Sequence, residues 1–205
     1  DINGKWNLIM QGENLDILDK YTQETICSLP LANKTDVESA VSSSVEGFNT
    51  LKKWSSGKRA DYLHLLYKAL ENRKDEAIDI IVCEAGKPRS YAESEVSRCL
   101  STIENAITHA KSFVGETVPI DFGAGEGKTA FTKRVPIGPI LCITPFNFPL
   151  NLVLHKVAPA LACGCSVIVK PAPQSPLSSL FLASLLEEVG YPAGVANFLL
   201  CNIPL

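Results

Sequence analysis

The sequence of 205 residues lacks several features that would place it in a specialised class of protein. No stretch reaches the roughly 18 uninterrupted apolar residues that a membrane-spanning helix needs, and the N-terminus shows no secretory pattern. A net charge of −3 gives no reason to expect a nucleic acid or an anionic membrane as a partner. No internal repeat or low-complexity segment is present. We therefore expect an ordinary globular protein with no nucleic-acid or membrane partner.

Cysteine and histidine patterns typical of disulfide frameworks and metal sites are also missing. The seven cysteines are odd in number and scattered, and five of them fall in expected helices or strands among apolar neighbours. Free cysteines in such places behave as small hydrophobic residues, which indicates a reducing compartment, and we expect a cytoplasmic location. Cys163 and Cys165 form a C-x-C pair, but no histidine or second pair lies at ligand spacing, so we expect no metal there.

The elements expected in the first half of the chain are strands followed by helices. Residues 1–30 show alternating and β-branched runs broken by glycine and asparagine, which predicts a short β meander. Three amphipathic helices follow, one opened by a capping box of Thr35 and Glu38, one over about 59–84 and one over about 92–113. One side of the first helix carries Val37, Val41, Ser44, Val45, Phe48 and Leu51.

A glycine-rich stretch from Phe122 to Thr129 resembles a phosphate-binding loop. That motif needs a glycine where Phe122 stands, a buried strand before the loop and a helix after it. Residues 117–121 form a weak strand at best, and residues 129–135 indicate a strand rather than a helix. We therefore predict a hairpin turn instead of a phosphate-binding loop.

The last third of the chain alternates between apolar strands and helices. Strands are expected at 139–143, 167–170 and about 195–200. The first intervening helix is expected to begin at Pro149, and the second to begin with Ser175 as its cap and Pro176 at its first position. Strands joined by crossover helices pair in parallel. The predicted fold class is therefore α/β, with a Rossmann-like parallel sheet preceded by the β meander and the three helices.

Two polar residues follow the first two strands of this sheet. Asn147 comes after the first strand, and Lys170 ends the second. Ligands of parallel sheets bind outside the carboxyl ends of the strands, so this placement indicates a nucleotide-type ligand. It does not identify the chemistry.

Several segments carry a resemblance to a known family. Three of them lie in the last third: PFNFPLNLVLHKVAPAL, VIVKPAPQSPLSS and EVGYPAGVANFL. Two more are EAGKPRSYAESEV at Glu84–Val96 and INGKW at Ile2–Trp6. Together they resemble the aldehyde dehydrogenase superfamily. The resemblance implies that residues 1–134 hold N-terminal helices and β segments, with an oligomerisation-type hairpin at about 117–135. Residues 135–205 would then be the first half of an NAD(P)-binding domain.

Family members oxidise an aldehyde through a cysteine nucleophile and pass hydride to a nicotinamide. Asn147 matches the asparagine whose side-chain amide stabilises the oxyanion; the alternative is a cap for the helix near Pro149. The preceding residues match the segment that borders the nicotinamide end of the cofactor: Ile143, Thr144, Pro145 and Phe146.

Lys170 matches the lysine that binds the adenosine ribose, although a lysine at a strand end is ordinarily only solvated. The cofactor-binding segment continues through Pro171, Ala172 and Pro173. Many relatives have glutamate where Pro173 stands. A carboxylate there favours NAD by binding the ribose hydroxyl and repelling a 2′-phosphate, so the expected cofactor is NAD or NADP.

The family's nucleophilic cysteine and general-base glutamate lie downstream of the matched region, and no cysteine of this chain aligns with the nucleophile. We therefore expect an N-terminal fragment of an NAD(P)-dependent aldehyde dehydrogenase that is inactive alone. Its expected partners are a small-molecule aldehyde, for the full-length protein, and further copies of itself. Two alternatives remain: a non-catalytic relative acting as a binding or assembly module, and a reductase of an acyl phosphate or acyl-CoA.

Overall fold

The computed structural model describes residues 2–5 and 13–201. The part of the predicted meander at residues 6–12, which includes Trp6, lies outside the described residues, as do residues 1 and 202–205. Within the described part, β1 (Asn14–Leu18) and β2 (Thr25–Pro30) form an antiparallel hairpin. The prediction of paired strands before residue 30 is confirmed to that extent.

Four helices follow, one more than predicted: α1 (Lys34–Leu51), α2 (Ser56–Asn72), α3 (Lys74–Ala85) and α4 (Arg89–Ser112). The single helix expected over 59–84 is wrong, because the chain leaves the helical conformation at Arg73 (φ −109°, ψ 24°). No apolar residue lies between Leu70 and Ala77, so no buried stripe supports a continuous helix through this segment.

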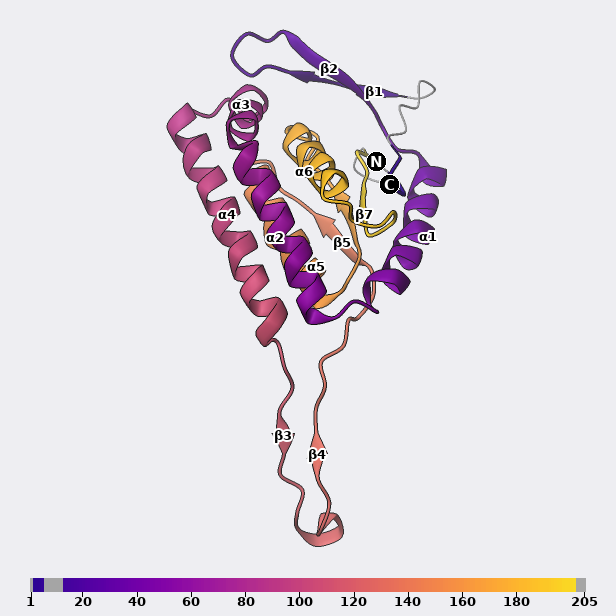
Figure 1. Ribbon diagram of the computed structural model, residues 1–205. Coiled ribbons are helices and arrows are strands. Elements are labelled where there is room, and N and C mark those ends of the chain that lie inside the picture. Colours follow the sequence, from indigo (N-terminus) through magenta and orange to yellow (C-terminus); the bar gives the residue numbers. More distant parts are fainter. Residues whose placement is uncertain (1, 6–12, 202–205) are drawn as a thin grey trace.

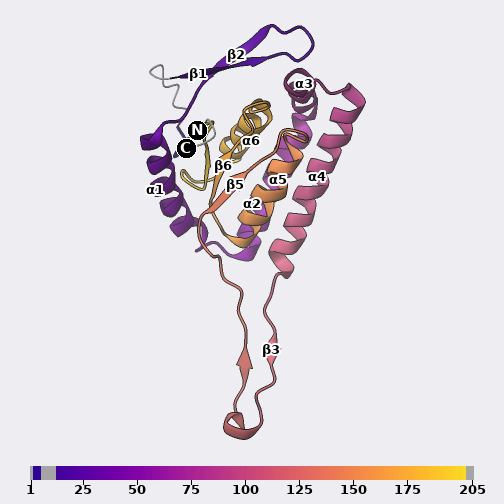
Figure 2. The same cartoon turned by 180° about the vertical axis from the view of Figure 1, so that it is seen from behind.

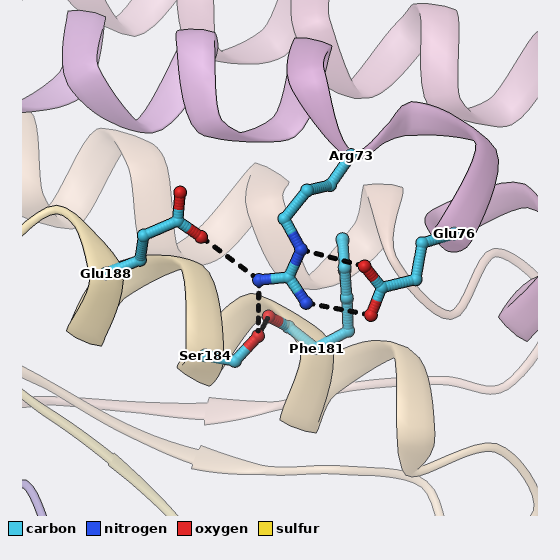
Figure 3. Close-up of polar contacts among 5 residues, drawn as sticks. All are labelled: Arg73, Glu76, Phe181, Ser184 and Glu188. Carbon is cyan, nitrogen blue, oxygen red and sulfur yellow. Dashed lines mark hydrogen bonds and ion pairs between the residues drawn. The ribbon is translucent and has the colours of Figure 1, made fainter.

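The side chain of Arg73 turns from this break toward α6 (Leu177–Glu188), as Figure 3 shows. Its guanidinium forms two 2.8 Å hydrogen bonds to the carboxylate of Glu76 and one of 3.1 Å to Glu188. It also contacts the hydroxyl of Ser184 at 3.3 Å and lies 4.9 Å from the centre of the Phe181 ring. The junction of α2 and α3 is therefore tethered to the C-terminal half of α6.

The cap of helix α1 lies two residues before the predicted cap. The Asn33 side chain accepts a hydrogen bond from the Asp36 amide at 3.1 Å, and the Asp36 carboxylate accepts one from the Asn33 amide at 2.9 Å. The capping box is thus Asn33–Asp36, and the predicted box of Thr35 and Glu38 is wrong. Both pairs satisfy the same spacing rule, so spacing alone could not choose between them.

The buried face of α1 also differs from the predicted one. Val41 and Val45 are 48% and 46% exposed, and the buried face holds Ala40, Ser43, Ser44, Gly47 and Leu51. Small residues are needed there because the backbones approach closely: a Cβ on Gly47 would lie 2.2 Å from the carbonyl carbon of Gly194.

The predicted hairpin between α4 and the sheet is confirmed. β3 (Thr117–Val118) and β4 (Ala130–Phe131) pair in antiparallel fashion, with a 3₁₀ turn at Gly123–Gly125 between them. No strand-to-helix turn of a phosphate-binding loop occurs here. The hairpin projects far from the body of the molecule (Figures 1 and 2), and its side chains of Phe122 and Phe131 are exposed.

The last third forms the predicted parallel sheet. β5 (Ile140–Ile143), β6 (Val167–Lys170) and β7 (Ala196–Phe198) lie in that order, joined by the crossover helices α5 (Asn151–Cys163) and α6. The α/β fold class is confirmed. Boundaries differ by a few residues, and α5 begins two residues after Pro149, where we expected it to start.

Side chains of the sheet alternate between its two faces. Cys142, Val167 and Val169 point into the main core, which α2–α6 share, whereas Ile168 packs against the smaller cluster of Ile2, Ala40 and Leu199 beside α1. On β5, which α1 does not cover, Leu141 and Ile143 are 62% and 60% exposed. One face of this apolar strand is therefore exposed. None of the described helices is long and apolar enough to cross a membrane.

Candidate functional site

Two loops leave the carboxyl edge of the sheet side by side. We call residues 144–150 the β5–α5 loop and residues 171–176 the β6–α6 loop. Ile143 and Lys170 are paired at the ends of β5 and β6, and both the amide and the hydroxyl of Thr144 donate to the Lys170 carbonyl at 3.2 Å. Across the loops the Ser175 hydroxyl donates to the Phe146 carbonyl at 3.4 Å. The predicted site residues are therefore brought together.

The β5–α5 loop presents its predicted site residues to the surface. Pro145, Phe146 and Asn147 are exposed, as is the preceding Ile143, while Thr144 is buried beneath them. Asn147 is not the cap of α5, because the N-cap position is Leu150. The alternative interpretation of Asn147 as a helix cap is therefore wrong, and the residue is exposed.

The β6–α6 loop is packed more tightly. Pro171 and Ala172 are buried, Pro173 is half-buried, and the Ser175 amide donates to the Ala172 carbonyl at 3.1 Å to close a turn. Lys170, also half-buried, forms no ion pair within the described part of the chain. An ammonium without a carboxylate partner at this edge is suited to an anionic or hydroxylated ligand.

The N-terminus of α5 is capped from a distance by a buried glutamate. One carboxylate oxygen of Glu95, on α4, accepts hydrogen bonds from the amides of Leu150 and Asn151 at 3.0 and 3.1 Å. Its other oxygen accepts a 2.6 Å charged bond from the ammonium of Lys87. The Glu95 side chain is fully buried, so these three donors replace its hydration.

The N-terminus of α6 is capped in the same way by Glu84, near the end of α3. Its carboxylate accepts from the amides of Leu177 and Ser178 at 2.6 and 2.7 Å and from the Ser178 hydroxyl. Burial raises the pKa of this carboxyl above its ordinary value, although the bonds to Ser178 and Leu177 act in the opposite direction. The predicted cap, Ser175 followed by Pro176, is wrong: Pro176 is the N-cap and has no side-chain bond.

Sequence reasoning missed the role of Glu84, Lys87 and Glu95, although the segment that holds them was singled out. The signal was indirect. Apolar or proline residues immediately precede α5 and α6, so these helices leave their first amides to be satisfied by something distant. The positive ends of helix dipoles also favour carboxylates. Nothing in the spacing shows which glutamate reaches which helix.

The reactive thiolate form is disfavoured at most of the described cysteines. Burial raises the pKa of five of them: Cys27, Cys83, Cys99, Cys142 and Cys163. For Cys142 the pKa rises to about 11. A reactive cysteine needs the opposite shift, produced by a neighbouring cation or helix N-terminus.

A cavity of about 840 Å³ lies elsewhere, between the base of the β3–β4 hairpin and the start of the sheet. Its lining includes Arg59, Lys133, Ile140, Lys156 and Cys165. These positions lie at the amino end of β5 and β6, opposite to the edge where parallel sheets bind nucleotides. Within residues 2–5 and 13–201, no group of three or more histidine, cysteine or acidic side chains is arranged to hold a metal ion.

Comparisons with known proteins agree on one family. The model of the aldehyde dehydrogenase family matches residues 8–202. A 3-sulfolactaldehyde dehydrogenase of Priestia megaterium is 39% identical over 194 residues, which cover 94% of this chain and 40% of the relative.

Solved structures agree with this match. Aldehyde dehydrogenase 21 of Physcomitrella patens, in complex with the product succinate, superposes with a TM-score of 0.93 at 32% identity, covering 99% of this chain and 42% of that one. An NADP-dependent enzyme of E. coli gives a TM-score of 0.94 at 30% identity, with 99% and 42% coverage. The chain thus spans about 40% of the length of the relatives that it matches.

Proposed function

The chain belongs to the aldehyde dehydrogenase family, and from this we propose that it is the N-terminal, cofactor-binding part of an NAD(P)-dependent aldehyde dehydrogenase. The whole enzyme would oxidise a small-molecule aldehyde to a carboxylic acid. The observation that carries the proposal is the pairing of two loops at the carboxyl edge of a parallel sheet, with the exposed Asn147 on one loop and Lys170 at the root of the other.

Asn147 is proposed as the oxyanion donor. Its side-chain amide is exposed and its neighbours are anchored, which suits a donor that must be in place before charge develops on the substrate oxygen. A bound nicotinamide would accept hydride from the substrate. Ile143, Thr144, Pro145 and Phe146 are proposed to border that end of the cofactor, where the exposed apolar side chains of Ile143 and Phe146 can shield it from water.

Lys170 is proposed to donate hydrogen bonds to the adenosine ribose, beside the backbone of Pro171, Ala172 and Pro173. The half-buried ammonium at the strand end, with no carboxylate partner among the described residues, fits a ribose hydroxyl or a 2′-phosphate. Pro173 offers no carboxylate to repel that phosphate. We therefore propose that the enzyme uses NADP at least as well as NAD.

The nucleophile and the general base are proposed to lie outside these 205 residues. The raised pKa values of five buried or half-buried thiols support this, because a nucleophilic cysteine needs the opposite shift. The 205-residue chain alone is therefore expected to oxidise no aldehyde.

The remaining assignments follow the same family. Residues 1–134 would form the N-terminal segments and residues 135–205 the first half of the NAD(P)-binding domain. The projecting hairpin at about 117–135, with exposed Phe122, Phe131 and Val135, is proposed to contact a neighbouring subunit of a homo-oligomer. Seven free cysteines support a reducing compartment, for which we propose the cytoplasm.

The test is cofactor-dependent oxidation of aldehydes by the protein as its gene encodes it. A panel of small aldehydes is combined with NAD and with NADP, and formation of the reduced cofactor is followed by absorbance. Oxidation that depends on cofactor and aldehyde is the expected result. Turnover only in the reverse direction, from an acyl phosphate or acyl-CoA, would identify a reductase instead. No turnover in either direction would favour a binding or assembly module.

A further inference from the structure

The segment Glu84–Val96 was singled out in the sequence, yet the proposed cofactor and oxyanion roles do not use it. We propose that Glu95, with its ion-pair partner Lys87, is a positioning residue that holds the β5–α5 loop so that the Asn147 amide is fixed for oxyanion stabilisation. The inference rests on the proposed role of Asn147 and adds to it the group that sets its position.

Glu95 fixes the chain just after Asn147. Its carboxylate oxygen binds two successive amides, Leu150 at 3.0 Å and Asn151 at 3.1 Å, and these are the first donors of α5. Two bonds to one oxygen define both the position of the helix end and the direction in which the loop leaves it. Because Glu95 is fully buried on α4, its own position is set by packing.

Lys87 links Glu95 to Phe148, the residue next to Asn147. Its ammonium lies 2.6 Å from Glu95 and 4.0 Å from the centre of the Phe148 ring. The guanidinium of Arg98 approaches that ring from 5.7 Å. Cations over an aromatic face attract it, so Phe148 is held by two cations of the α3–α4 region.

Two further bonds complete the anchoring of the loop. The Thr102 hydroxyl, about one helical turn beyond Arg98 on α4, donates to the Asn151 side-chain oxygen at 3.1 Å. On the other side of the loop, Ser175 donates to the Phe146 carbonyl. Asn147 is thus an exposed residue between two anchored neighbours, Phe146 and Phe148.

This arrangement matters for rate because an oxyanion donor acts through its position. Displacement of a catalytic group by about 1 Å can lower a rate by about 10²-fold. Replacing the Glu95 carboxylate by an amide weakens the acceptor for the α5 amides, because a neutral oxygen binds an N–H less strongly than a carboxylate does, and it leaves Lys87 without its partner. The loop then loses the charge that holds the Lys87 ammonium beside Phe148.

The experiment is a double-mutant cycle in the enzyme as its gene encodes it, with Glu95→Gln, Asn147→Ala and both together. Glu84→Gln is the matched control, because Glu84 is an equally buried glutamate that caps α6 instead of α5. We expect Glu95→Gln to lower kcat by about 10-fold to 10²-fold in the wild-type background, with KM for the cofactor unchanged. In the Asn147→Ala background it should lower kcat by less than about twofold.

A second readout needs neither substrate nor cofactor. Hydrogen exchange of the Leu150 and Asn151 amides should accelerate in Glu95→Gln and stay as in the wild type in Glu84→Gln, which should affect Leu177 and Ser178 instead. Lys87→Met serves as a second variant if Glu95→Gln does not fold, since it keeps the Glu95 acceptor and removes only the cation. It should show the same dependence on Asn147.

The outcomes separate the inference from the proposed function. If Glu95→Gln leaves kcat unchanged, lowers it equally in both Asn147 backgrounds, or leaves the Leu150 and Asn151 amides protected, the positioning role is overturned while the oxyanion role stands. If Asn147→Ala itself leaves kcat unchanged, the oxyanion role fails and the positioning role fails with it. If a loss of kcat caused by Glu84→Gln also disappeared in the Asn147→Ala background, the losses would reflect general instability rather than positioning.

Discussion

The β5–α5 loop and the β6–α6 loop leave adjacent parallel strands, and each leads into a helix capped by a buried glutamate of the α3–α4 region. Their exposure differs. The first loop presents Pro145, Phe146 and Asn147 to the surface, whereas the second buries Pro171 and Ala172. An exposed loop can therefore be well anchored, because the anchors lie in its backbone and flanking residues rather than in its functional side chain.

The two capping glutamates differ in charge balance. Glu95 has the Lys87 ammonium at 2.6 Å, so a fully buried carboxylate is paired with a half-buried ammonium. Glu84 has only neutral donors within hydrogen-bond distance, and burial raises its pKa. The β5–α5 loop, which carries Asn147, therefore leads into a helix whose capping glutamate is paired with an ammonium. The β6–α6 loop leads into a helix whose capping glutamate has only neutral donors.

At their opposite ends the two helices are held by arginines of the same helical layer. Arg59 donates to the Ala162 carbonyl near the end of α5 at 2.8 Å, where Gly164 reverses the chain with φ +86°. Arg73 binds Glu188 and Ser184 near the end of α6 (Figure 3). Each crossover helix thus has a carboxylate at its positive end and a guanidinium near its negative end.

The largest expected effect is a difference in stability between the two caps. Glu95→Ala leaves the Lys87 charge poorly solvated and without its partner, and should lower the free energy of unfolding by about 3–5 kcal/mol. Glu84→Ala leaves only neutral donors unpaired and should cost about 1–3 kcal/mol. Urea unfolding of both variants tests the ranking, and equal losses would show that the ion pair adds nothing to the α5 cap.

The next effect separates the exposed amides of the two loops. Asn147→Ala should lower kcat/KM by about 10²–10³, as loss of one oxyanion donor does, with little change in melting temperature because Asn147 caps no helix. Gln174, an exposed amide of the β6–α6 loop, is the matched control, and Gln174→Ala should leave kcat unchanged. If Asn147→Ala lowered the melting temperature without lowering kcat/KM, the role of Asn147 would be structural.

Much of this comparison could be predicted from the sequence. The strands, the crossover helices and the positions of Asn147 and Lys170 follow from apolar runs and breakers, which are local signals. The caps do not, because Glu84 and Glu95 reach amides 93 and 55 residues away. The break at Arg73 was missed for the same reason: its side chain finds partners on α6, more than a hundred residues later. Polar contacts between residues far apart in the chain produce no recognisable pattern of spacing in the sequence.

A smaller effect concerns the cofactor at the β6–α6 loop. Pro173→Glu introduces a carboxylate near Lys170, which should repel a 2′-phosphate and shift discrimination toward NAD by about tenfold, or about 1.4 kcal/mol. The measurement is kcat/KM for NAD and NADP in both proteins. A wild type that already prefers NAD by more than about 10²-fold would contradict the role given to Pro173.

The smallest expected effect is a pH dependence confined to the α6 cap. Because the pKa of Glu84 is raised in the folded state, protonation of Glu84 stabilises the fold. This contribution to stability is present in full at pH values below the ordinary pKa of 4.5, and it is lost as pH rises through the raised pKa. The unfolding free energy of the wild type relative to Glu84→Gln should therefore increase as pH falls through that window. Parallel pH profiles of the two proteins would contradict the raised pKa.

The central claim is that the carboxyl edge of the sheet, and not the cavity beside Arg59 and Lys133, binds the dinucleotide. Hydrogen exchange of the protein as its gene encodes it, with and without saturating NADP, tests this most directly. The account predicts new protection of the amides in residues 143–147 and at Lys170 and Ala172. Protection confined to the segments that line the cavity, with the carboxyl edge unchanged, would contradict it.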